Sequence, residues 1–265
     1  MTSRALCIGI NDYPGTSSDL SGCVNDAKDW AAMLSGRGFE VTTLFDSDAT
    51  KANMAAAIGE VVRGAGYGDL AVITYSGHGT WVPDQDGDEP DQRDEALCPY
   101  DINRNNLLLD DELYDIFEQR QRGSRIVFIS DSCHSGSVSR MAPPAGDNPT
   151  RIRFLPPETF LEPRDLAVAR HLPPVTRGRS RSHTALLFSG SQDWEYSYDA
   201  SFGGRPNGAF SYFALQSLGE LPAGADYRAW YRKIREKLPT QNYPQSPNFQ
   251  GSSGMKRWSI LEEGR

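Results

Sequence analysis

The sequence lacks the features that mark several common classes of protein. Its 4 cysteines are widely scattered and form no CxxC pair, so neither a disulfide framework nor a structural zinc site is expected. No apolar run approaches the ~18 residues that span a bilayer, and no glycine-rich phosphate loop follows the first predicted strand. Cys7 and Cys98 lie in apolar stretches and are predicted to be core residues.

Basic residues are also scarce relative to acidic ones. The chain has 27 Lys and Arg against 35 Asp and Glu, for a formal net charge of -8. This balance argues against nucleic acid as a partner, because binding to phosphates needs a basic surface. The N-terminal apolar run is too short for a signal peptide. We therefore expect a cytoplasmic globular protein that does not bind membranes.

The first half of the chain alternates strand and helix patterns. Apolar runs predict strands at 5–10, 40–45, 69–76 and 125–130, and helical spacing predicts helices at 23–39, 51–65 and 110–121. Asp48 or Thr50 can cap the second helix. This order predicts a parallel sheet with helices on both faces.

The pattern breaks at residues 141–183. This segment holds eight of the 17 prolines and seven arginines, so we expect that it cannot build a core. A strand at 184–191, helices at 208–218 and 226–238 and an edge strand at 257–261 follow it. We therefore predict one domain over 1–265, with halves at 1–140 and 184–265 joined by this linker.

Two reactive side chains follow neighbouring predicted strands. His78 lies in "YSGHGT" after the third strand, and Cys133 lies in "SDSCHSG" after the fourth. Function gathers at the carboxyl ends of parallel strands, so the two are predicted to face each other as base and nucleophile. The amides of Gly79 and Cys133 are then positioned to form an oxyanion hole. The alternatives are a structural loop histidine and a core cysteine, while His134 is the competing base.

These motifs resemble those of the caspase-like cysteine peptidases, and closely those of the metacaspases and their bacterial relatives. The segments "ALCIGINDY", "LSGCVNDAKDW", "DEALCPYD", "FSGSQDWEYSYD" and "QSPNFQGS" continue the resemblance in family order. It implies a caspase-hemoglobinase fold, which is a three-layer α/β/α sandwich with a mostly parallel six-stranded sheet and an antiparallel edge strand. It also implies peptide-bond hydrolysis by the dyad of His78 and Cys133 with no cofactor required for the chemistry. Caspases are dimers and metacaspases are usually monomers, so the resemblance leaves the oligomeric state open, and we expect a monomer.

The expected specificity follows from charge. Caspases that cleave after aspartate carry basic residues in the pocket for the residue before the scissile bond (P1). In metacaspases the residues lining this S1 pocket correspond here to Cys23, Asp26, Ser76 and Asp131. Two carboxylates bind a cation and repel an aspartate, so we predict cleavage after Arg and then Lys. Asp26 can also simply favour the N-terminus of its helix.

The resemblance also suggests a calcium site. The ligands of calcium-activated metacaspases correspond here to Asp94, Asp110 and Asp111, and a fourth position is Arg140, whose charge opposes a cation. Calcium is therefore a candidate activator, although the charge of Arg140 argues against calcium binding. Asp110 or Asp111 can instead cap the helix that follows.

The linker is a candidate processing site. Exposed proline-rich segments are easily nicked, and this one carries the residue type that the acidic pocket prefers. We predict cleavage at one or more of Arg170, Arg177, Arg179 and Arg181, by the enzyme itself or by an upstream protease. The bland alternatives are an uncut surface loop and a basic patch for a partner. For the whole protein, the rival interpretations are a silent caspase-like scaffold and another cysteine acyl hydrolase.

Overall fold

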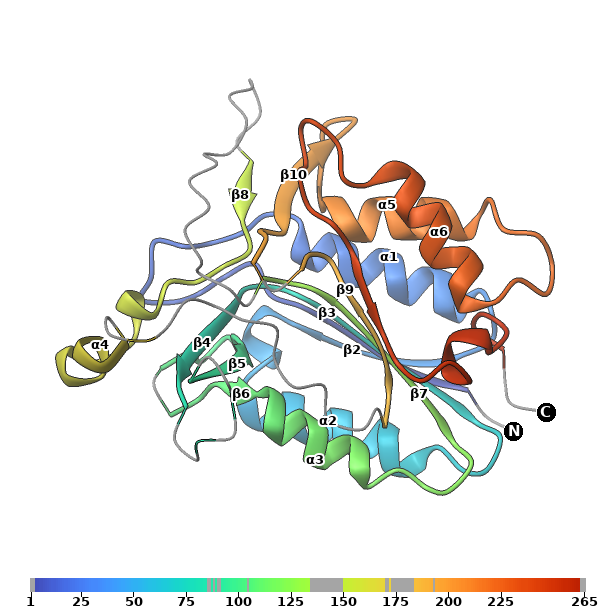
Figure 1. Ribbon diagram of the computed structural model, residues 1–265, viewed down its shortest axis with the longest axis horizontal. Helices are drawn as coiled ribbons and strands as arrows, with labels where there is room; N and C mark the ends of the chain where they lie inside the picture. The colour runs from blue at the N-terminus through green and yellow to red at the C-terminus, as the bar shows by residue number, and fades with distance from the viewer. Residues whose placement is uncertain are drawn as a thin grey trace.

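The computed structural model describes residues 3–84, 87, 89, 92–103, 105–133, 150–169, 172, 184–192 and 194–262. A six-stranded sheet forms its centre, in the order β12-β9-β7-β3-β1-β2 (Figure 1). The strands are β1 Arg4–Gly9, β2 Glu40–Phe45, β3 Leu70–Ser76, β7 Arg125–Asp131, β9 Leu186–Ser189 and β12 Asn248–Gln250. All pair in parallel except β12, which is antiparallel to β9. The predicted fold class is thus confirmed.

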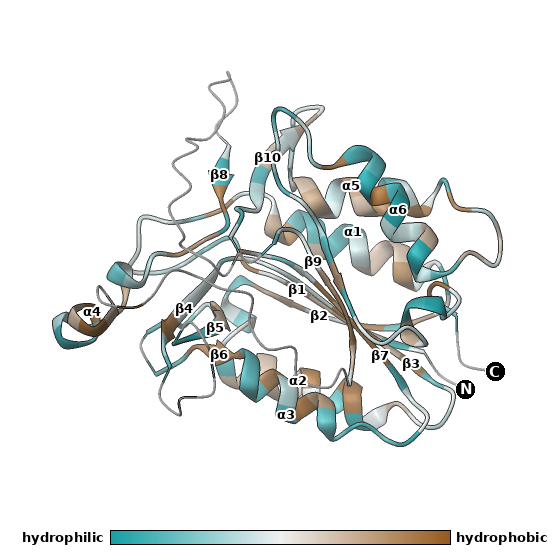
Figure 2. Ribbon diagram, viewed as in Figure 1, coloured by the Kyte–Doolittle hydropathy of each residue, from teal (hydrophilic) through white to brown (hydrophobic). Residues whose placement is uncertain are grey.

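Helices cover both faces of this sheet (Figure 1). One face carries α1 Cys23–Ser35, α5 Ala209–Leu218 and α6 Tyr227–Lys237, and the other carries α2 Lys51–Gly64 and α3 Asp110–Glu118. Burial from both sides explains why the central strands are nearly continuous in apolar residues (Figure 2). Among the helices of the described residues, none has the length and hydrophobicity to cross a membrane.

Helix ends follow local sequence signals. Thr50 Oγ1 accepts a hydrogen bond from the Asn53 amide at 3.3 Å, so Thr50 rather than Asp48 is the N-cap of α2. The pattern over 23–39 predicts a stop at Gly36 and Gly38, and helix α1 does end at Ser35, with Gly36 as its C-cap and Gly38 at a φ of +88°.

Two small antiparallel sheets extend the fold beyond the carboxyl ends of the central strands. One contains β4 Gly79–Pro83, β5 Arg93–Leu97 and β6 Leu108–Leu109. The other contains β8 Arg151–Ile152, β10 Tyr198–Phe202 and β11 Arg205–Gly208. The sequence did not predict these short strands. β4 begins directly after His78, and Arg153 directly follows β8. Both sheets border the region of His78 and Cys133, because the amides of Gly79 and Cys133 donate to the Arg153 carbonyl.

The predicted edge strand at 257–261 is wrong. The antiparallel edge is β12, and the later segment begins with a 3-10 turn, Met255–Arg257, followed by one isolated bridge between Ser259 and Asp226. Its apolar residues Ile260 and Leu261 are buried in the core beside α6, although they do not form a strand. The apolar pattern therefore predicted the burial of these residues correctly, but it did not predict their backbone conformation.

The prediction that 141–183 cannot build a core is also wrong for its described part. Leu155 is fully buried, Leu161 is nearly so, and a short helix, α4 Pro163–Ala169, follows. Arg153 is 0% exposed. Repulsion among the arginines does not exclude this arrangement, because carboxylates distant in the sequence neutralise the buried one.

Candidate active site

His78 is held by the backbone and by two tyrosines. Its amide donates to the Tyr13 hydroxyl at 2.7 Å, and the Tyr75 hydroxyl donates to its carbonyl at 2.6 Å. A Cβ on Gly77 would lie 2.5 Å from the Tyr75 hydroxyl and 2.7 Å from that of Tyr13. Glycine before His78 is therefore required by the tyrosine contacts that fix this loop.

The imidazole of His78 is oriented by a carbonyl. Its Nε2 lies 2.6 Å from the Ser18 carbonyl oxygen, which can only accept, so Nε2 carries the proton. Nδ1 has no hydrogen-bond partner within the described residues and presents a lone pair. Burial, reinforced by the charge of Arg153, lowers the pKa of His78 to about 4. The ring is thus neutral near pH 7 and able to accept a proton at Nδ1.

Cys133 lies two residues beyond the end of β7 and is 1% exposed. Its thiol donates a hydrogen bond to the Glu195 carbonyl at 2.8 Å. The backbone amides of Gly79 and Cys133 both donate to the carbonyl oxygen of Arg153, at 3.0 and 3.2 Å. The ends of β3 and β7 therefore meet around a single carbonyl group, which brings the histidine loop and the cysteine loop together.

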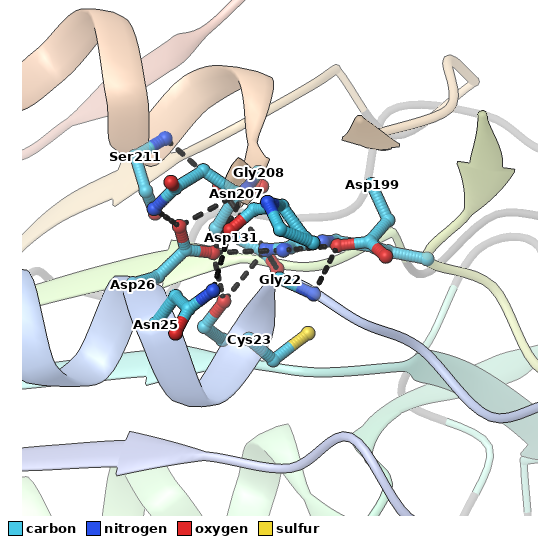
Figure 3. Close-up of polar contacts among 12 residues, drawn as sticks. Gly22, Cys23, Asn25, Asp26, Asp131, Asp199, Asn207, Gly208 and Ser211 are labelled. Atoms are coloured by element: carbon cyan, nitrogen blue, oxygen red, sulfur yellow. Dashed lines mark hydrogen bonds and ion pairs between the residues drawn. The ribbon is translucent and has the colours of Figure 1, made fainter. Parts of the chain in front are cut away.

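The side chain of Arg153 fills an acidic pocket beside this carbonyl. Its Nη2 lies 2.7 Å from Asp26 Oδ2 and 2.9 Å from Asp199 Oδ1. Its Nη1 lies 3.2 Å from Asp131 Oδ2 and donates to Ser76 Oγ at 2.6 Å. The three carboxylates point toward one another from separate chain segments (Figure 3). All three are almost completely buried. The pocket is built to surround a planar guanidinium with oxygens.

The three carboxylates are themselves held in place by further donors. Each carboxylate accepts at least two hydrogen bonds from other chain segments. The donors are the amides of Ser21, Gly22, Gly208 and Ser211, the hydroxyls of Ser76 and Ser197 and the side chain of Asn207. A Cβ on Gly208 would meet Asp131 and Arg153, which explains glycine at that position. These donors hold the carboxylates in position around Arg153.

Charge repulsion remains in the pocket despite the arginine. Burial raises the pKa of Asp26 to about 6, and Asp131 adds to this shift while Arg153 opposes it. Burial also raises the pKa of the Cys23 thiol well above its ordinary value. The charges of Arg153 and Asp199 also act on this thiol. Because its pKa is raised, Cys23 borders the cluster as a neutral group.

Residues 151–155 lie across the site as an extended segment. On one side of Arg153, Ile152 pairs in antiparallel register with Tyr198, and the Arg153 amide donates to the Ser197 carbonyl at 2.9 Å. On the other side, the Leu155 amide donates to the Gly79 carbonyl at 2.9 Å. The peptide backbone is thus bound on both sides of the carbonyl that receives the two amides.

Sequence reasoning missed three functional groups. Asp199 lies in "SYDA", a segment noted only for its resemblance, and nothing local marks it as a third carboxylate. The Ser18 carbonyl is invisible in a sequence. Arg153 was counted among the repelling arginines of the linker, although its position 20 residues after Cys133 carries no signal of its own.

The candidate calcium residues lie apart from this pocket. Asp110 and Asp111 occupy the first turn of α3, where Leu109 rather than either of them is the N-cap residue. Burial raises the pKa of Asp110 to about 7, with Asp111, Glu89 and Asp94 adding repulsion. In the part of the chain that is described, no three His, Cys, Asp or Glu side chains are placed to hold a metal ion. Calcium activation remains a prediction.

Several predicted residues fall outside the described residues. They are His134, Arg140 and the four candidate processing residues Arg170, Arg177, Arg179 and Arg181.

Comparison of the sequence with known proteins identifies the family. The family model described as "Caspase domain" matches residues 2–257. Metacaspase-1A of Aspergillus fumigatus is 30% identical over 282 residues, which span 93% of this chain and 68% of that protein. Metacaspase-7 of Arabidopsis thaliana is 43% identical over 148 residues, which span 52% of this chain and only 36% of that longer protein.

Two solved structures have the same fold. Protein GSU0716 from Geobacter sulfurreducens superimposes with a TM-score of 0.76 at 32% sequence identity, covering 100% of both chains. Caspase-1 from Spodoptera frugiperda superimposes with a TM-score of 0.61 at 13% identity, covering 94% of this chain and 86% of that one. The second likeness concerns the fold alone.

Proposed function

Because this chain belongs to the caspase family of cysteine peptidases, we propose that it is an endopeptidase that cleaves proteins or peptides after arginine, and more slowly after lysine. The observation that carries this proposal is the buried guanidinium of Arg153 among Asp26, Asp131 and Asp199. A pocket that accommodates an arginine of its own chain has the shape and charge to accept one from a substrate.

Arginine fits this pocket better than lysine for a geometric reason. The oxygens approach two different nitrogens of the planar guanidinium, Asp26 and Asp199 at Nη2 and Asp131 at Nη1. A lysine ammonium is a single point charge and cannot make both sets of contacts. An aspartate side chain would add a fourth negative charge to a buried acidic cluster, so it is rejected.

The proposed chemistry uses His78 and Cys133 as the dyad. The thiol gives its proton to Nδ1 of His78, and the sulfur attacks the carbonyl carbon after the P1 arginine. The amides of Gly79 and Cys133 stabilise the oxyanion. The protonated imidazole, oriented by the Ser18 carbonyl, then returns the proton to the leaving amine, and water hydrolyses the thioester. No step requires a cofactor.

The same pocket supports a zymogen. In the structure described here the cleft is occupied by Arg153, so an external substrate cannot enter until that residue leaves. We propose that cleavage within the 141–183 linker, by the enzyme itself or by another protease, activates it.

The test is a panel of fluorogenic peptides that differ only in P1, assayed with wild type before and after limited cleavage of its linker by immobilised trypsin. We expect hydrolysis after Arg, less after Lys and none after Asp, and no hydrolysis by Cys133→Ala. Asp131→Asn should lower kcat/KM for Arg peptides by about 10- to 100-fold, as expected for one charged hydrogen bond. The matched control is Asp115→Asn, at an exposed position on α3, which should change nothing.

Two rival functions make different predictions in this assay. Folded wild type that cleaves none of the peptides after its linker has been cut would indicate a silent scaffold. Faster cleavage after Asp than after Arg would refute the assignment of the pocket. Turnover of small acyl esters without any peptide cleavage would indicate another cysteine acyl hydrolase.

A further inference from the structure

We propose that the peptide bond between Arg153 and Phe154 is this protein's own processing bond, and that residues 151–155 occupy the cleft as a pseudosubstrate until Cys133 of the same molecule cuts it. The inference rests on the proposed function and goes beyond it, because it selects one bond. The sequence pointed instead to Arg170, Arg177, Arg179 and Arg181.

The first argument is that two independent parts of Arg153 are bound as a P1 residue would be. Its guanidinium lies in the acidic pocket, within 3.2 Å of each of three carboxylates. Its carbonyl oxygen accepts from the amides of Gly79 and Cys133. An arginine that served only to neutralise buried carboxylates would have no reason to place its carbonyl between these two amides.

The second argument is the backbone on either side. Before the bond, Arg151 and Ile152 pair with β10 in antiparallel register, as an added strand does in many peptide complexes. After the bond, Phe154 forms a parallel bridge with Gly79, and Thr80 Oγ1 donates to the Leu155 carbonyl at 2.7 Å. The cleft therefore binds the chain across the bond and not merely up to it.

The third argument is the state of the nucleophile. The Cys133 thiol donates to the Glu195 carbonyl at 2.8 Å, so its proton is held by that carbonyl and not by His78. Cleavage requires the thiol to leave this partner and give its proton to Nδ1 of His78. The bound segment is thereby protected in the resting state and remains cleavable.

The reaction balances without any group beyond water. The sulfur of Cys133 bonds to the carbonyl carbon of Arg153, the bond to the Phe154 nitrogen breaks, and His78 delivers the thiol proton to that nitrogen. Water then splits the thioester, which restores the thiol and leaves a carboxylate on Arg153 and an amino group on Phe154. Because both partners belong to one chain, the step is first order.

The two products should remain associated. The fragment 1–153 contains β7 and the fragment 154–265 contains β9, which are adjacent in the central sheet. Leu155 is anchored in the core directly after the cut. We therefore expect two chains on a denaturing gel and a single species of unchanged size on a native column.

The experiment follows the freshly purified full chain by intact mass spectrometry and N-terminal sequencing, with the Arg-P1 peptide assay run on the same samples. We expect a new N-terminus at Phe154 in wild type and none in Cys133→Ala, at a rate that does not change over a 100-fold dilution. Arg153→Lys should still be cut, more slowly. Arg153→Gln should lose this cut by at least about 100-fold, because the pocket oxygens are left without their cation.

The matched control is Arg164→Gln, an arginine of the same linker whose side chain is 69% exposed, which should leave the cut unchanged. An intact chain in wild type that hydrolyses Arg-P1 peptides would overturn the inference and leave the proposed function standing. So would cleavage at other arginines only, or a rate that falls on dilution. If wild type with a cut linker hydrolyses no Arg-P1 peptide, the proposed function itself fails. Arg153→Lys covers the case in which the glutamine variant does not fold.

Discussion

Replacing Arg153 with Gln should destabilise the protein strongly, and the effect should grow with pH. The side chain is 0% exposed and neutralises Asp26, Asp131 and Asp199 at 2.7 to 3.2 Å. Removing one partner of a buried ion pair destabilises a protein by about 3–5 kcal/mol, because the remaining charge is left buried and unpaired. We therefore expect a loss of about 3–5 kcal/mol in the free energy of unfolding at pH 8.

The pH dependence has a definite sign. Asp26 already has a pKa raised to about 6 with the arginine present. Without the cation this pKa rises further, so the folded variant takes up a proton more readily than its unfolded state as the pH falls. Protonation relieves the unpaired charge, and the loss of stability should therefore shrink between pH 8 and pH 5.

The measurement is urea unfolding followed by tryptophan fluorescence, with Cys133→Ala in both proteins to prevent self-cleavage. Arg205→Gln is the matched control, since Arg205 pairs with Asp29 at the surface, where the two side chains are 46% and 36% exposed. Exposed pairs contribute below about 1 kcal/mol. Added Nα-acetyl-arginine amide should raise the urea midpoint of the Arg153→Gln protein, because it supplies the missing guanidinium. It should not raise the midpoint of the protein that keeps Arg153. A loss no larger than that of the control at pH 8 would refute the assignment of a buried ion cluster.

Three further predictions concern other sites, all measured by urea unfolding with Cys133→Ala present. Burial lowers the pKa of His78 to about 4, so its neutral form contributes stability that is complete above pH 6.5 and is lost by pH 4. His78→Gln should remove about 3 kcal/mol of this pH dependence. The same dependence of unfolding free energy on pH in both proteins would contradict the prediction. Asp110 has a pKa raised to about 7, so its charge destabilises the fold at higher pH, but solvent screens much of this repulsion because the residue is exposed. Asp110→Asn should therefore gain about 1 kcal/mol at pH 8 and progressively less toward pH 4, and a gain that is independent of pH would contradict it. Asp226 accepts from the Ala229 amide at 2.8 Å as the N-cap of α6, so Asp226→Ala should lose about 1 kcal/mol, with the exposed Asp48→Ala as its control.

Much of the fold could be predicted because its signals are local. The doubly buried strands appear as continuous apolar runs, and the helices between them appear as 3.6-residue periodicity, so the parallel sheet and its two helical layers follow from connection rules. The small antiparallel sheets could not be predicted, since Arg151–Ile152 and Leu108–Leu109 are two-residue strands. The segment at 257–261 shows the same limit, because its apolar residues are buried without forming a strand.

The sequence by itself determined which chemical groups are present at the strand ends. His78 and Cys133 were identified because each follows a strand whose carboxyl end the parallel topology directs to one edge of the sheet. The resemblance to metacaspases added Cys23, Asp26, Ser76 and Asp131. Their local context and resemblance to the caspase family were sufficient to propose a thiol, a base and an acidic pocket.

Only the tertiary structure decided what lies in that pocket. Asp199 and the Ser18 carbonyl reach the site from segments far away in the chain, and their contribution depends on distances that no local pattern encodes. Arg153 looked like one more repelling charge in a proline-rich linker. Its burial is possible only because three carboxylates from separate segments converge around it, and that convergence is a property of the folded chain.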